Sequence, residues 1–410
     1  MACVTPFRLA VALDGAGWHP AAWREPDARP QALLTAAYWT ELAQEAERGK
    51  LDFVTFEDSL APGSERAEPS HPADPADPGH RPDLVVGRLD AALIAARVAP
   101  LTSRIGLVPT VTTSHPEPFH ISTAIATLDY VSSGRAGWRP QIGRASEAGH
   151  FGRRDDLDPA ELLDEAADVV EVVRRLWDSW QDDAIIRDAD TGRFLDRDRL
   201  NYIDFEGRFF SVKGPSITPR PPQGQPVVVA SATSTPHYRF AARSADVVLV
   251  TPSDEDDVRL IVGAVRAEES ALNRLAGAPD PGTAGSETRP PLRIFADLAV
   301  FLDDTEAAAA ARKTRLDDLA GASFNSEAAV FVGTPNQLVH RLQAWQRAGI
   351  EGFRLRPGAL PHDLHAITRA VVPALQENDA FRRGYEARSL RALLGLPRPA
   401  NRYPARSTTP

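Results

Sequence analysis

The sequence predicts an α/β fold, a TIM (β/α)8 barrel with insertions and a C-terminal helical extension. Two observations lead to this prediction. Eight short apolar runs of the kind that form buried parallel strands recur along the chain, and segments with helical spacing of apolar residues separate them. The composition shows no second domain and no internal repeat, so we expect residues 1–410 to form a single barrel domain.

One repeating unit of this fold is clearest in residues 104–138. An apolar run at 105–108 predicts a buried strand, and it ends in a polar loop that contains hydroxyl side chains and three prolines. Residues 119–130 then have helical spacing, and a new strand begins at 135. Strand, loop, helix and strand make one βαβ unit, and the loop at the carboxyl end of the strand is where such folds carry their chemistry.

The remaining elements follow the same pattern in order. Strands are predicted at 7–13, 53–56, 105–108, 135–138, 226–230, 247–250, 294–302 and 352–355. Helices are predicted at 32–48, 84–98, 119–130, 161–180, 238–243, 254–276, 305–319 and 335–348, the last with Thr334 as its N-cap. Stretches rich in proline, glycine or charge predict insertions at about 61–82, 181–222 and 277–291, the second with a hairpin around Glu206-Gly207.

Charge and cysteine content narrow the class of protein. The net charge of −10 argues against nucleic acid or an anionic membrane as a partner, and no stretch approaches a membrane span. A single cysteine, Cys3, excludes an internal disulfide and a cysteine-based metal site. The ten histidines include no H-E-x-x-H pattern, so no metal site is expected. The N-terminal stretch lacks a basic segment before its short apolar run, which favours a cytoplasmic protein.

The predicted barrel mouth offers candidate functional residues because each follows a strand. The first loop contains Trp18 and His19, which form either a lid over the rim or a wall for substrate. Asp58, after the second strand, is either a helix cap or a ligand contact. Thr112 and His115 follow the third strand, and a hydroxyl there donates to a ligand carbonyl or caps backbone. We predict His115 and, less directly, His19 as catalytic candidates, against the alternative that both are ordinary loop residues.

Several segments, in order, carry a family resemblance. They are YWTELAQEAERGKLDFVTFEDS (38–59), RIGLVPTVTTSHPEPF (104–119), LDYVSSGRAGW (128–138), LWDSW (176–180), GPSITPRPPQGQPVVVA (214–230) and the C-terminal VVPALQENDAFRRGYEARSLRALLGL (371–396) with RPANRY (398–403). With these segments the chain resembles the bacterial-luciferase-like flavin-dependent monooxygenases, in the branch of the nitrilotriacetate, EDTA and dibenzothiophene-sulfone monooxygenases. The resemblance covers nearly the whole length.

The resemblance implies an enzyme that receives reduced FMN from a separate flavin reductase and uses dioxygen to oxygenate a small organic substrate. It also implies a homo-oligomer. Asp58 matches an acidic position near the flavin in relatives, and Thr112 matches a Ser/Thr that hydrogen-bonds the flavin. The run from Gly134 to Trp138 matches fully, which places Trp138 at the mouth or, alternatively, in packing.

The departures from the family pattern concern flavin contacts. Relatives usually follow GRAGW with Asn-Val-Val-Thr-Ser, where this chain has Arg139-Pro140-Gln141-Ile142-Gly143. Pro159 and Leu163 stand where relatives carry a His and a Tyr.

The family's phosphate loop is also altered, with His237 in place of a glycine. Its hydroxyls still predict a phosphate site at a helix N-terminus, and the expected cofactor-binding residues there are Ser231, Thr233, Ser234, His237 and Tyr238.

Two other functions remain open from the sequence. The same barrel could use the deazaflavin F420 for hydride transfer without oxygen chemistry. A barrel that has lost its flavin contacts could instead bind a small ligand without catalysis. In each case we expect the mouth to be lined by Trp18, His19, Asp58, Thr112, His115, Trp138 and Ser234, and a structure with Asp58 and Thr112 at opposite ends would contradict this arrangement.

Overall fold

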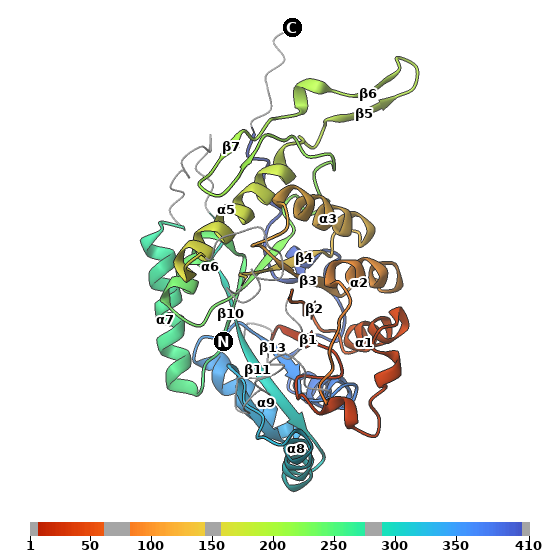
Figure 1. Cartoon of the computed structure of the whole chain (residues 1–410), viewed down its shortest axis with the longest axis vertical. Coiled ribbons are helices and arrows are strands. Elements are labelled where there is room, and N and C mark those ends of the chain that lie inside the picture. The colour runs from red at the N-terminus through yellow and green to blue at the C-terminus, as the bar shows by residue number, and fades with distance from the viewer. Residues whose placement is uncertain (1–6, 61–82, 144–156, 275–288, 404–410) are drawn as a thin grey trace, which may run out of the picture.

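A computed structural model describes residues 7–60, 83–143, 157–274 and 289–403. Eight parallel strands close into a barrel in the order β10-β9-β4-β3-β2-β1-β13-β11, and β11 pairs back with β10 (Figure 1). The barrel strands are β1 (Leu9–Leu13), β2 (Phe53–Phe56), β3 (Gly106–Thr112), β4 (Gly137–Gln141), β9 (Val227–Ser231), β10 (Val247–Val250), β11 (Arg293–Leu302) and β13 (Gly352–Pro357). The predicted eight-stranded barrel is therefore confirmed.

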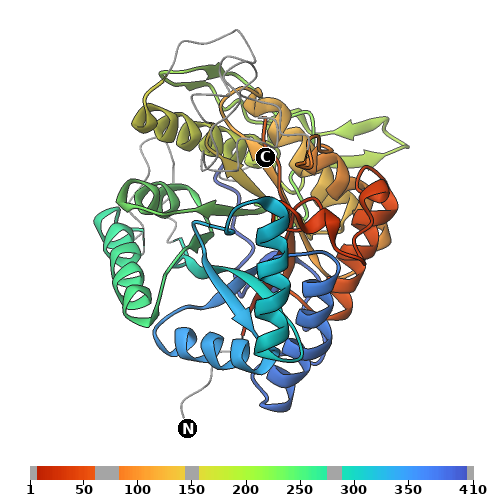
Figure 2. The same ribbon diagram turned by 60° about the horizontal axis from the view of Figure 1, so that its bottom comes forward.

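Helices surround the strands and form the outer layer (Figure 2). They are α1 (Ala36–Arg48), α2 (Ala91–Val98), α3 (Pro118–Val131), α5 (Pro159–Asp178), α6 (Thr235–Ser244), α7 (Glu255–Ala271), α8 (Glu306–Ala320), α9 (Pro335–Arg347), α10 (His362–Ala366) and α11 (Val372–Glu377). The short helix α12 (Leu390–Leu393) instead closes the lower end of the barrel. Short 3-10 turns cover Ala22–Arg24, Pro30–Ala32, Ala99–Leu101 and Arg197–Arg199, and a π-helical turn covers Ile367–Val371. The last helices of the chain form the predicted C-terminal extension.

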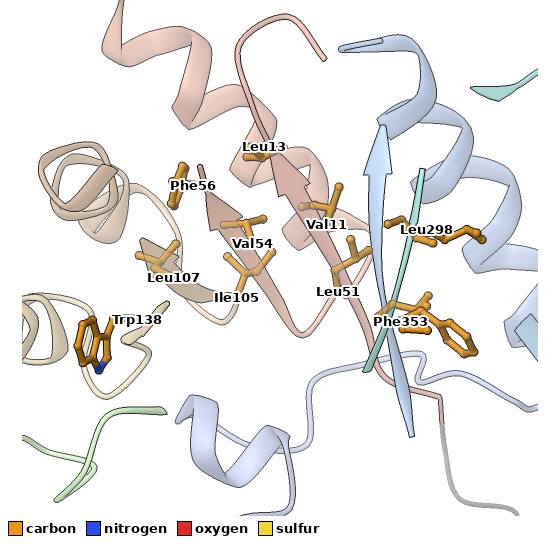
Figure 3. Close-up of a cluster of buried hydrophobic side chains, with 14 of the residues drawn as sticks. Val11, Leu13, Leu51, Val54, Phe56, Ile105, Leu107, Trp138, Leu298 and Phe353 are labelled. Atoms are coloured by element: carbon orange, nitrogen blue, oxygen red, sulfur yellow. The ribbon is translucent and has the colours of Figure 1, made fainter. Parts of the chain in front are cut away.

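Outward-facing strand residues pack against these helices and form the main hydrophobic core. Figure 3 shows part of it, with Val54 of β2, Leu107 of β3 and Trp138 of β4 among the buried side chains. Side chains alternate between the two faces of a strand, so the neighbours of these residues point into the barrel. The barrel interior is therefore formed by the opposite set of positions.

The lower half of the barrel interior is apolar and is sealed by the C-terminal segment. Its side chains are Ala10, Phe53, Val108, Val227, Val229, Val247, Leu249 and Phe295 from the strands, with Leu390, Leu394 and Leu396 from the chain end. Gly106 and Gly137 make room for this plug, because a Cβ atom at either position would lie 2.6 Å or 3.2 Å from the Leu390 side chain. The resemblance segment at 371–396 thus supplies the floor of the barrel.

The structure corrects several predicted boundaries. The helix predicted from residue 84 begins at Ala91, because Asp90 caps it by accepting a hydrogen bond from the Leu93 N–H at 2.8 Å. Strand β3 continues through its hydroxyl residues to Thr112, and α6 is longer than predicted at both ends. Thr334 caps α9 as predicted, within a capping box.

Additional strands lie outside the barrel. β12 (Ala329–Gly333), which the sequence analysis did not predict, pairs with the distal half of β11. The predicted hairpin around Glu206 is formed by β7 (Phe205–Glu206) and β8 (Ser211–Val212). A second hairpin, β5 (Ile185–Asp188) and β6 (Arg193–Leu195), projects away from the barrel (Figure 1). The predicted insertion at 61–82 and most of that at 277–291 lie outside the described residues.

Candidate active site

The upper half of the barrel interior is charged, in contrast to its floor. Glu57 follows β2, Arg139 lies on β4, Asp297 on β11, and Arg354 and Arg356 on β13. All of them are at most 8 % exposed. They alternate along their strands with outward apolar residues, so the strand period places their side chains inside the barrel near its carboxyl-terminal mouth. We call this set the charge chain.

Each member of the charge chain is paired with an opposite charge. Arg139 donates from Nη2 to Glu57, and Arg354 donates from Nη1 to Glu57 at 2.9 Å. Arg354 also forms a two-pronged pair with Asp297 at 2.7 and 2.6 Å, and Arg356 donates from Nη2 to the same carboxylate. Three guanidinium groups and two carboxylates leave one positive charge unbalanced.

The charge chain keeps its carboxylates ionised although they are buried. Burial alone would raise the pKa of Glu57, but the guanidinium groups of Arg139 and Arg354 outweigh it and lower that pKa. Burial likewise opposes ionisation of Asp297, and Arg354 and Arg356 nevertheless lower its pKa to about 2. At neutral pH the upper interior is thus a fixed arrangement of charges.

Arg139 connects the charge chain to the two strands that carry predicted flavin contacts. Its Nε donates to the Thr110 hydroxyl at 3.1 Å, and its Nη1 donates to the Ser231 hydroxyl at 3.3 Å. Thr112 lies two residues beyond Thr110 on β3 and therefore shares its inward face. It is buried, and its hydroxyl has no hydrogen-bond partner among the described residues. The carboxyl ends of β3, β4 and β9 thus present hydroxyl groups beside a cation.

The loop after β3 contains His115, the second residue predicted for the site in this region. Ser114 accepts a hydrogen bond from the Gly143 N–H at 3.0 Å, and Thr113 donates to the Gln141 carbonyl at 3.1 Å. These two bonds join the loop to the end of β4. His115 follows directly and is half-buried. It therefore lies at the same end of the barrel as Thr112, as predicted.

Asp58 lies at the mouth but acts as a backbone acceptor. Its carboxylate accepts hydrogen bonds from the Ser59 N–H at 2.8 Å and from the Ala91 N–H at 2.9 Å, at the start of α2. Burial raises its pKa, partly offset by these two bonds. The helix-cap interpretation of Asp58 matches this geometry. Glu57, its neighbour, is the carboxylate that faces the barrel interior.

His19 is held by both of its ring nitrogens. Nδ1 accepts a hydrogen bond from the Ala21 N–H at 3.1 Å, so the proton must be on Nε2, which lies 3.0 Å from an Asp317 oxygen. The ring also packs against Phe301 and Phe324, and burial lowers its pKa. A neutral, fully bonded imidazole fits the lid interpretation of this loop better than proton transfer.

Trp138 does not point into the mouth, although it was predicted to line it. The ring is fully buried in the outer core between the strands and helices (Figure 3), whereas Gly137 and Arg139 on either side of it face inward. The physical reason is strand alternation: a residue next to an inward glycine points outward. Of the two alternatives for Trp138, a place in the core packing is therefore the one that matches its position.

The predicted phosphate loop lies at the carboxyl end of β9 and enters α6. Ser231 and Thr233 precede the helix, and Ser234 is its N-cap residue without a side-chain capping bond. The Ser234 hydroxyl instead lies 2.7 Å from Nδ1 of His237, whose pKa is lowered by burial. Tyr238 is only 7 % exposed and packs in the main core. The side chains of Ser231, Thr233, Ser234 and His237 thus lie together at the N-terminus of α6, whereas Tyr238 packs between this helix and the core.

The two positions where relatives have His and Tyr carry structural residues here. Pro159 is the first residue of α5, behind a capping box formed by Asp158 and Glu161. Leu163 is partly buried against the main core. Neither side chain can donate a hydrogen bond to a ligand.

A cavity of about 210 Å³ opens beside the charge chain, between the loop after β1, the end of β2 and the segment before α2. Residues after α8 close its other side. Its wall is rich in aromatic and aliphatic side chains, among them Trp18, Trp23, Trp39, Phe56 and Phe324. Asp14, Glu57 and Arg88 contribute charged groups to it. An apolar cavity with a few polar groups is the usual form of a small-molecule site.

Several residues of this site were missed by sequence reasoning. Arg139 was noted only as a departure from the family pattern, Asp297 and Arg354 were read as parts of apolar strands, and Arg356 lay just beyond the last predicted strand. A signal was present, because the alternating Phe-Arg-Leu-Arg of β13 has the period that puts both arginines on one face. Among the described residues, no group of three or more His, Cys, Asp or Glu is placed to hold a metal ion. The described helices also include none that is long and apolar enough to cross a membrane.

Comparison with known proteins was made by sequence and by structure. A profile of the family described as luciferase-like monooxygenase matches residues 16–324. The chain is 31 % identical to N-acetyl-S-(2-succino)cysteine monooxygenase of Bacillus subtilis (strain 168), over 97 % of this chain and 98 % of that protein. It is 28 % identical to nitrilotriacetate monooxygenase component A of Aminobacter aminovorans, over 94 % and 95 %. The structure of EDTA monooxygenase from Chelativorans sp. BNC1 superimposes with a TM-score of 0.78 at 23 % identity, covering 96 % of this chain and 99 % of that one.

Proposed function

Because the chain belongs to the luciferase-like monooxygenase family, we propose that it uses reduced FMN from a separate reductase and dioxygen to oxygenate a small organic substrate. The observation that carries this proposal is the family match across most of the barrel, together with a mouth of inward hydroxyl and cationic groups beside an apolar cavity. The substrate is a small molecule, because the cavity is enclosed by the first two βα loops.

The residues at the carboxyl ends of β3, β4 and β9 fit a flavin nucleotide. Thr112 is a buried residue whose hydroxyl has no partner in the described structure, which suits a hydrogen bond to a carbonyl on the ring. Ser231, Thr233 and Ser234 lie where α6 begins, and the N-terminus of a helix favours a phosphate dianion. These residues would hold the two ends of the cofactor.

In this proposal the protein binds and orients the flavin and the substrate, and it excludes water from the site. The bound reduced flavin supplies the electrons for oxygen activation. Arg139, fixed by Glu57 and two hydroxyls, provides a positive charge that does not need to reorganise when a ligand arrives. The aromatic wall of the cavity keeps the substrate in a dry environment. His115 remains our candidate for proton transfer, and we assign His19 to the lid over the barrel rim.

We extend the proposal to the partners and location of the protein. A flavin reductase is the expected protein partner, which the name "component A" of the nitrilotriacetate enzyme supports, because it implies a second component. A homo-oligomer and a cytoplasmic location are proposed with it. Nucleic acid and membrane are not expected as partners, given the net charge of −10.

Anaerobic titration of the purified chain with oxidised FMN, reduced FMN and F420 tests the cofactor. We expect oxidised FMN to bind weakly, since Pro159 and Leu163 offer no polar contact. The proposed function further requires that reduced FMN binds in preference to F420. Two missing hydrogen bonds correspond to roughly a five- to 150-fold loss of affinity, so the preparation should be colourless. Preferential binding of F420 would move the function to hydride transfer. Failure to bind any of the three would support a non-catalytic ligand-binding barrel.

Oxygen consumption tests the reaction itself. The chain is mixed with NADH, FMN and an unrelated flavin reductase, and candidate substrates are screened for oxygenated products by mass spectrometry. Incorporation of ¹⁸O from labelled dioxygen into a product identifies a monooxygenase. Reduction of a substrate without incorporation of oxygen would contradict the proposal.

A further inference from the structure

The cavity contains an arginine that forms no ion pair within the described residues. Arg88 lies on the segment between β2 and α2 and lines the cavity. Its Nη1 atom is buried and has no hydrogen-bond partner. Within the described residues, no carboxylate lies within ion-pairing distance of its guanidinium group. Burying a charged donor without a partner costs free energy, which a ligand that supplies an acceptor recovers.

The acidic side chains near Arg88 are engaged elsewhere. Asp58 is held by the backbone N–H groups of Ser59 and Ala91, and Asp90 by that of Leu93. Glu57, which also lines the cavity, is paired with two arginines of the charge chain. These contacts hold the nearby carboxylates away from an ion pair with Arg88, although its charge still lowers the pKa of Asp58 at longer range.

The charge chain adds to the positive potential of the cavity. Trp18 in the cavity wall stacks on Arg356, whose guanidinium carbon is 4.4 Å from the ring centroid. Arg356 is the terminal member of a chain with one unbalanced positive charge, and its Nε is also buried without a hydrogen-bond partner. Asp14 in the cavity lining offsets one positive charge, so Asp14, Arg88 and the charge chain together carry a net charge of +1. The low-dielectric side chains of the pocket wall strengthen this potential beside the arginines, which favours an anion there.

We propose that the cavity binds a substrate with an apolar or aromatic body and one anionic oxygen group, a carboxylate or a sulfonate, and that Arg88 binds that group. A guanidinium fork matches the planar geometry of a carboxylate and donates two parallel hydrogen bonds to it. The aromatic side chains around it accept the apolar body. The inference rests on the proposed function, because it names the substrate class of that same site.

The test uses a matched pair of probes, 4-phenylbutyrate and its neutral amide, 4-phenylbutyramide. Their binding to the purified full-length chain, without flavin, is measured by calorimetry and by quenching of tryptophan fluorescence, since Trp18, Trp23 and Trp39 line the cavity. We expect the acid to bind at least tenfold more tightly than the amide. Arg88→Gln should remove this preference and leave amide binding unchanged, and Arg88→Lys should keep part of it.

The control is Arg97→Gln, on the exposed face of the neighbouring helix α2, which should behave as the unaltered chain. Equal binding of acid and amide to the unaltered chain, no binding of the acid at millimolar concentration, or a preference that survives Arg88→Gln would each overturn the inference. A thermal melt of each variant separates a lost site from a lost fold.

A parallel titration with reduced FMN separates this inference from the proposed function. We expect Arg88→Gln to bind reduced FMN as the unaltered chain does. A chain that binds no flavin but keeps the Arg88-dependent preference would contradict the monooxygenase and retain the anion site. A chain that binds reduced FMN but does not discriminate between the probes would overturn the anion site alone.

Discussion

The two halves of the barrel interior are made by the same strands and have opposite chemistry. Phe53 of β2 joins the apolar floor, whereas Glu57, directly after the end of that strand, belongs to the charge chain. In β11 the same change occurs between Phe295 and Asp297, over a single strand period. The floor is closed by side chains from the C-terminal segment, and the upper half faces the mouth and the cavity.

This difference separates what stabilises the barrel from what prepares it for a ligand. Apolar burial in the floor contributes about 25 cal/mol per Å² of surface removed from water. A buried ion network brings little net stability, because removing charges from water costs about as much as their attraction returns. Breaking such a network is nevertheless costly. The floor therefore accounts for stability, and we attribute the charge chain to the site.

The largest expected effect comes from breaking the charge chain at its centre. Glu57→Gln leaves the buried side chains of Arg139 and Arg354 without a shared carboxylate. We expect the free energy of unfolding to fall by about 3–5 kcal/mol, as measured by urea denaturation. The same substitution at the exposed ion pair of Glu41 with Arg29 serves as the control and should cost at most about 1 kcal/mol. Equal losses in the two variants would remove the distinction between the two halves.

A substitution in the floor should affect stability alone. Leu390→Ala leaves a cavity beneath Gly106 and Gly137, and we expect a loss of about 3 kcal/mol in the free energy of unfolding. The affinity for reduced FMN should not change, because the floor does not contact the mouth. Leu93→Ala, at a residue that is 72 % exposed, is the matched control and should be close to neutral. A fall in flavin affinity for Leu390→Ala would show that the halves are coupled.

The strands and helices that form the floor and the outer core could be predicted from the sequence for a physical reason. Parallel strands buried on both faces read as continuous apolar runs, and helices show their own period, so β1, β2, β10 and β11 were predicted to within a few residues. The predicted start of the helix at residue 84 was too early. Leu84, Val85 and Leu89 are apolar because they line the cavity, not because they lie on a helix face. Only tertiary context distinguishes an apolar helix face from an apolar pocket wall.

The charge chain in the upper half was harder to predict from the sequence, because a charged residue within an apolar run does not show which residue it pairs with. Asp297 and Arg354 lie 57 residues apart, and Glu57 and Arg354 lie 297 apart. Barrel closure brings them together, and no local pattern encodes these pairs. The family resemblance directed attention to Asp58, whereas the inward position belongs to Glu57. A strand count from Phe53, with alternate residues facing inward, would have selected Glu57.

Carboxylates at the two ends of the barrel should respond to pH in opposite directions. Asp129, near the floor, accepts hydrogen bonds from neutral donors of Gln223 and from the Ala136 N–H, and burial raises its pKa to about 6. Asp297 is paired with arginines, which lower its pKa to about 2 despite burial. Neutral donors offset the desolvation of a carboxylate only in part, whereas two guanidinium groups exceed it.

The sign of each effect follows from the difference between the folded and unfolded pKa. The folded pKa of Asp129 lies above its ordinary value of 3.8, so its stabilising contribution is complete below pH 3.8 and is lost as pH rises through about 6. That of Asp297 is present above 3.8 and lost as pH falls through about 2. Urea denaturation between pH 4 and pH 8 should show a decline of roughly 2–3 kcal/mol from Asp129. Asp129→Asn should flatten that decline, and an unchanged slope would contradict the assignment.

The smallest expected effect concerns the rim, where the charged half meets the predicted phosphate site. Ser234 is exposed and makes no capping bond, so Ser234→Ala should leave the melting temperature almost unchanged. If its hydroxyl binds the flavin phosphate, the binding free energy of reduced FMN should weaken by about 1–3 kcal/mol. A lowered melting temperature with unchanged affinity would contradict the phosphate assignment.

His237 adds a pH dependence to the same rim site. Its ring is hydrogen-bonded to Ser234, and burial lowers its pKa below the ordinary 6.5, with Glu327 acting in the opposite direction. The ring is therefore neutral at pH 7, and its positive charge can assist phosphate binding only below pH 6.5. A phosphate monoester takes up its own second proton near pH 6, which weakens binding in the same range.

Reduced-FMN affinity should thus be compared between the unaltered chain and His237→Gln. We expect equal affinities at pH 8 and a two- to fivefold advantage of the histidine near pH 5.5. That ratio corresponds to about 0.4–1 kcal/mol, the size of an exposed ion pair between an imidazolium and a phosphate. An advantage that is the same at both pH values would assign His237 to packing of the loop rather than to the phosphate.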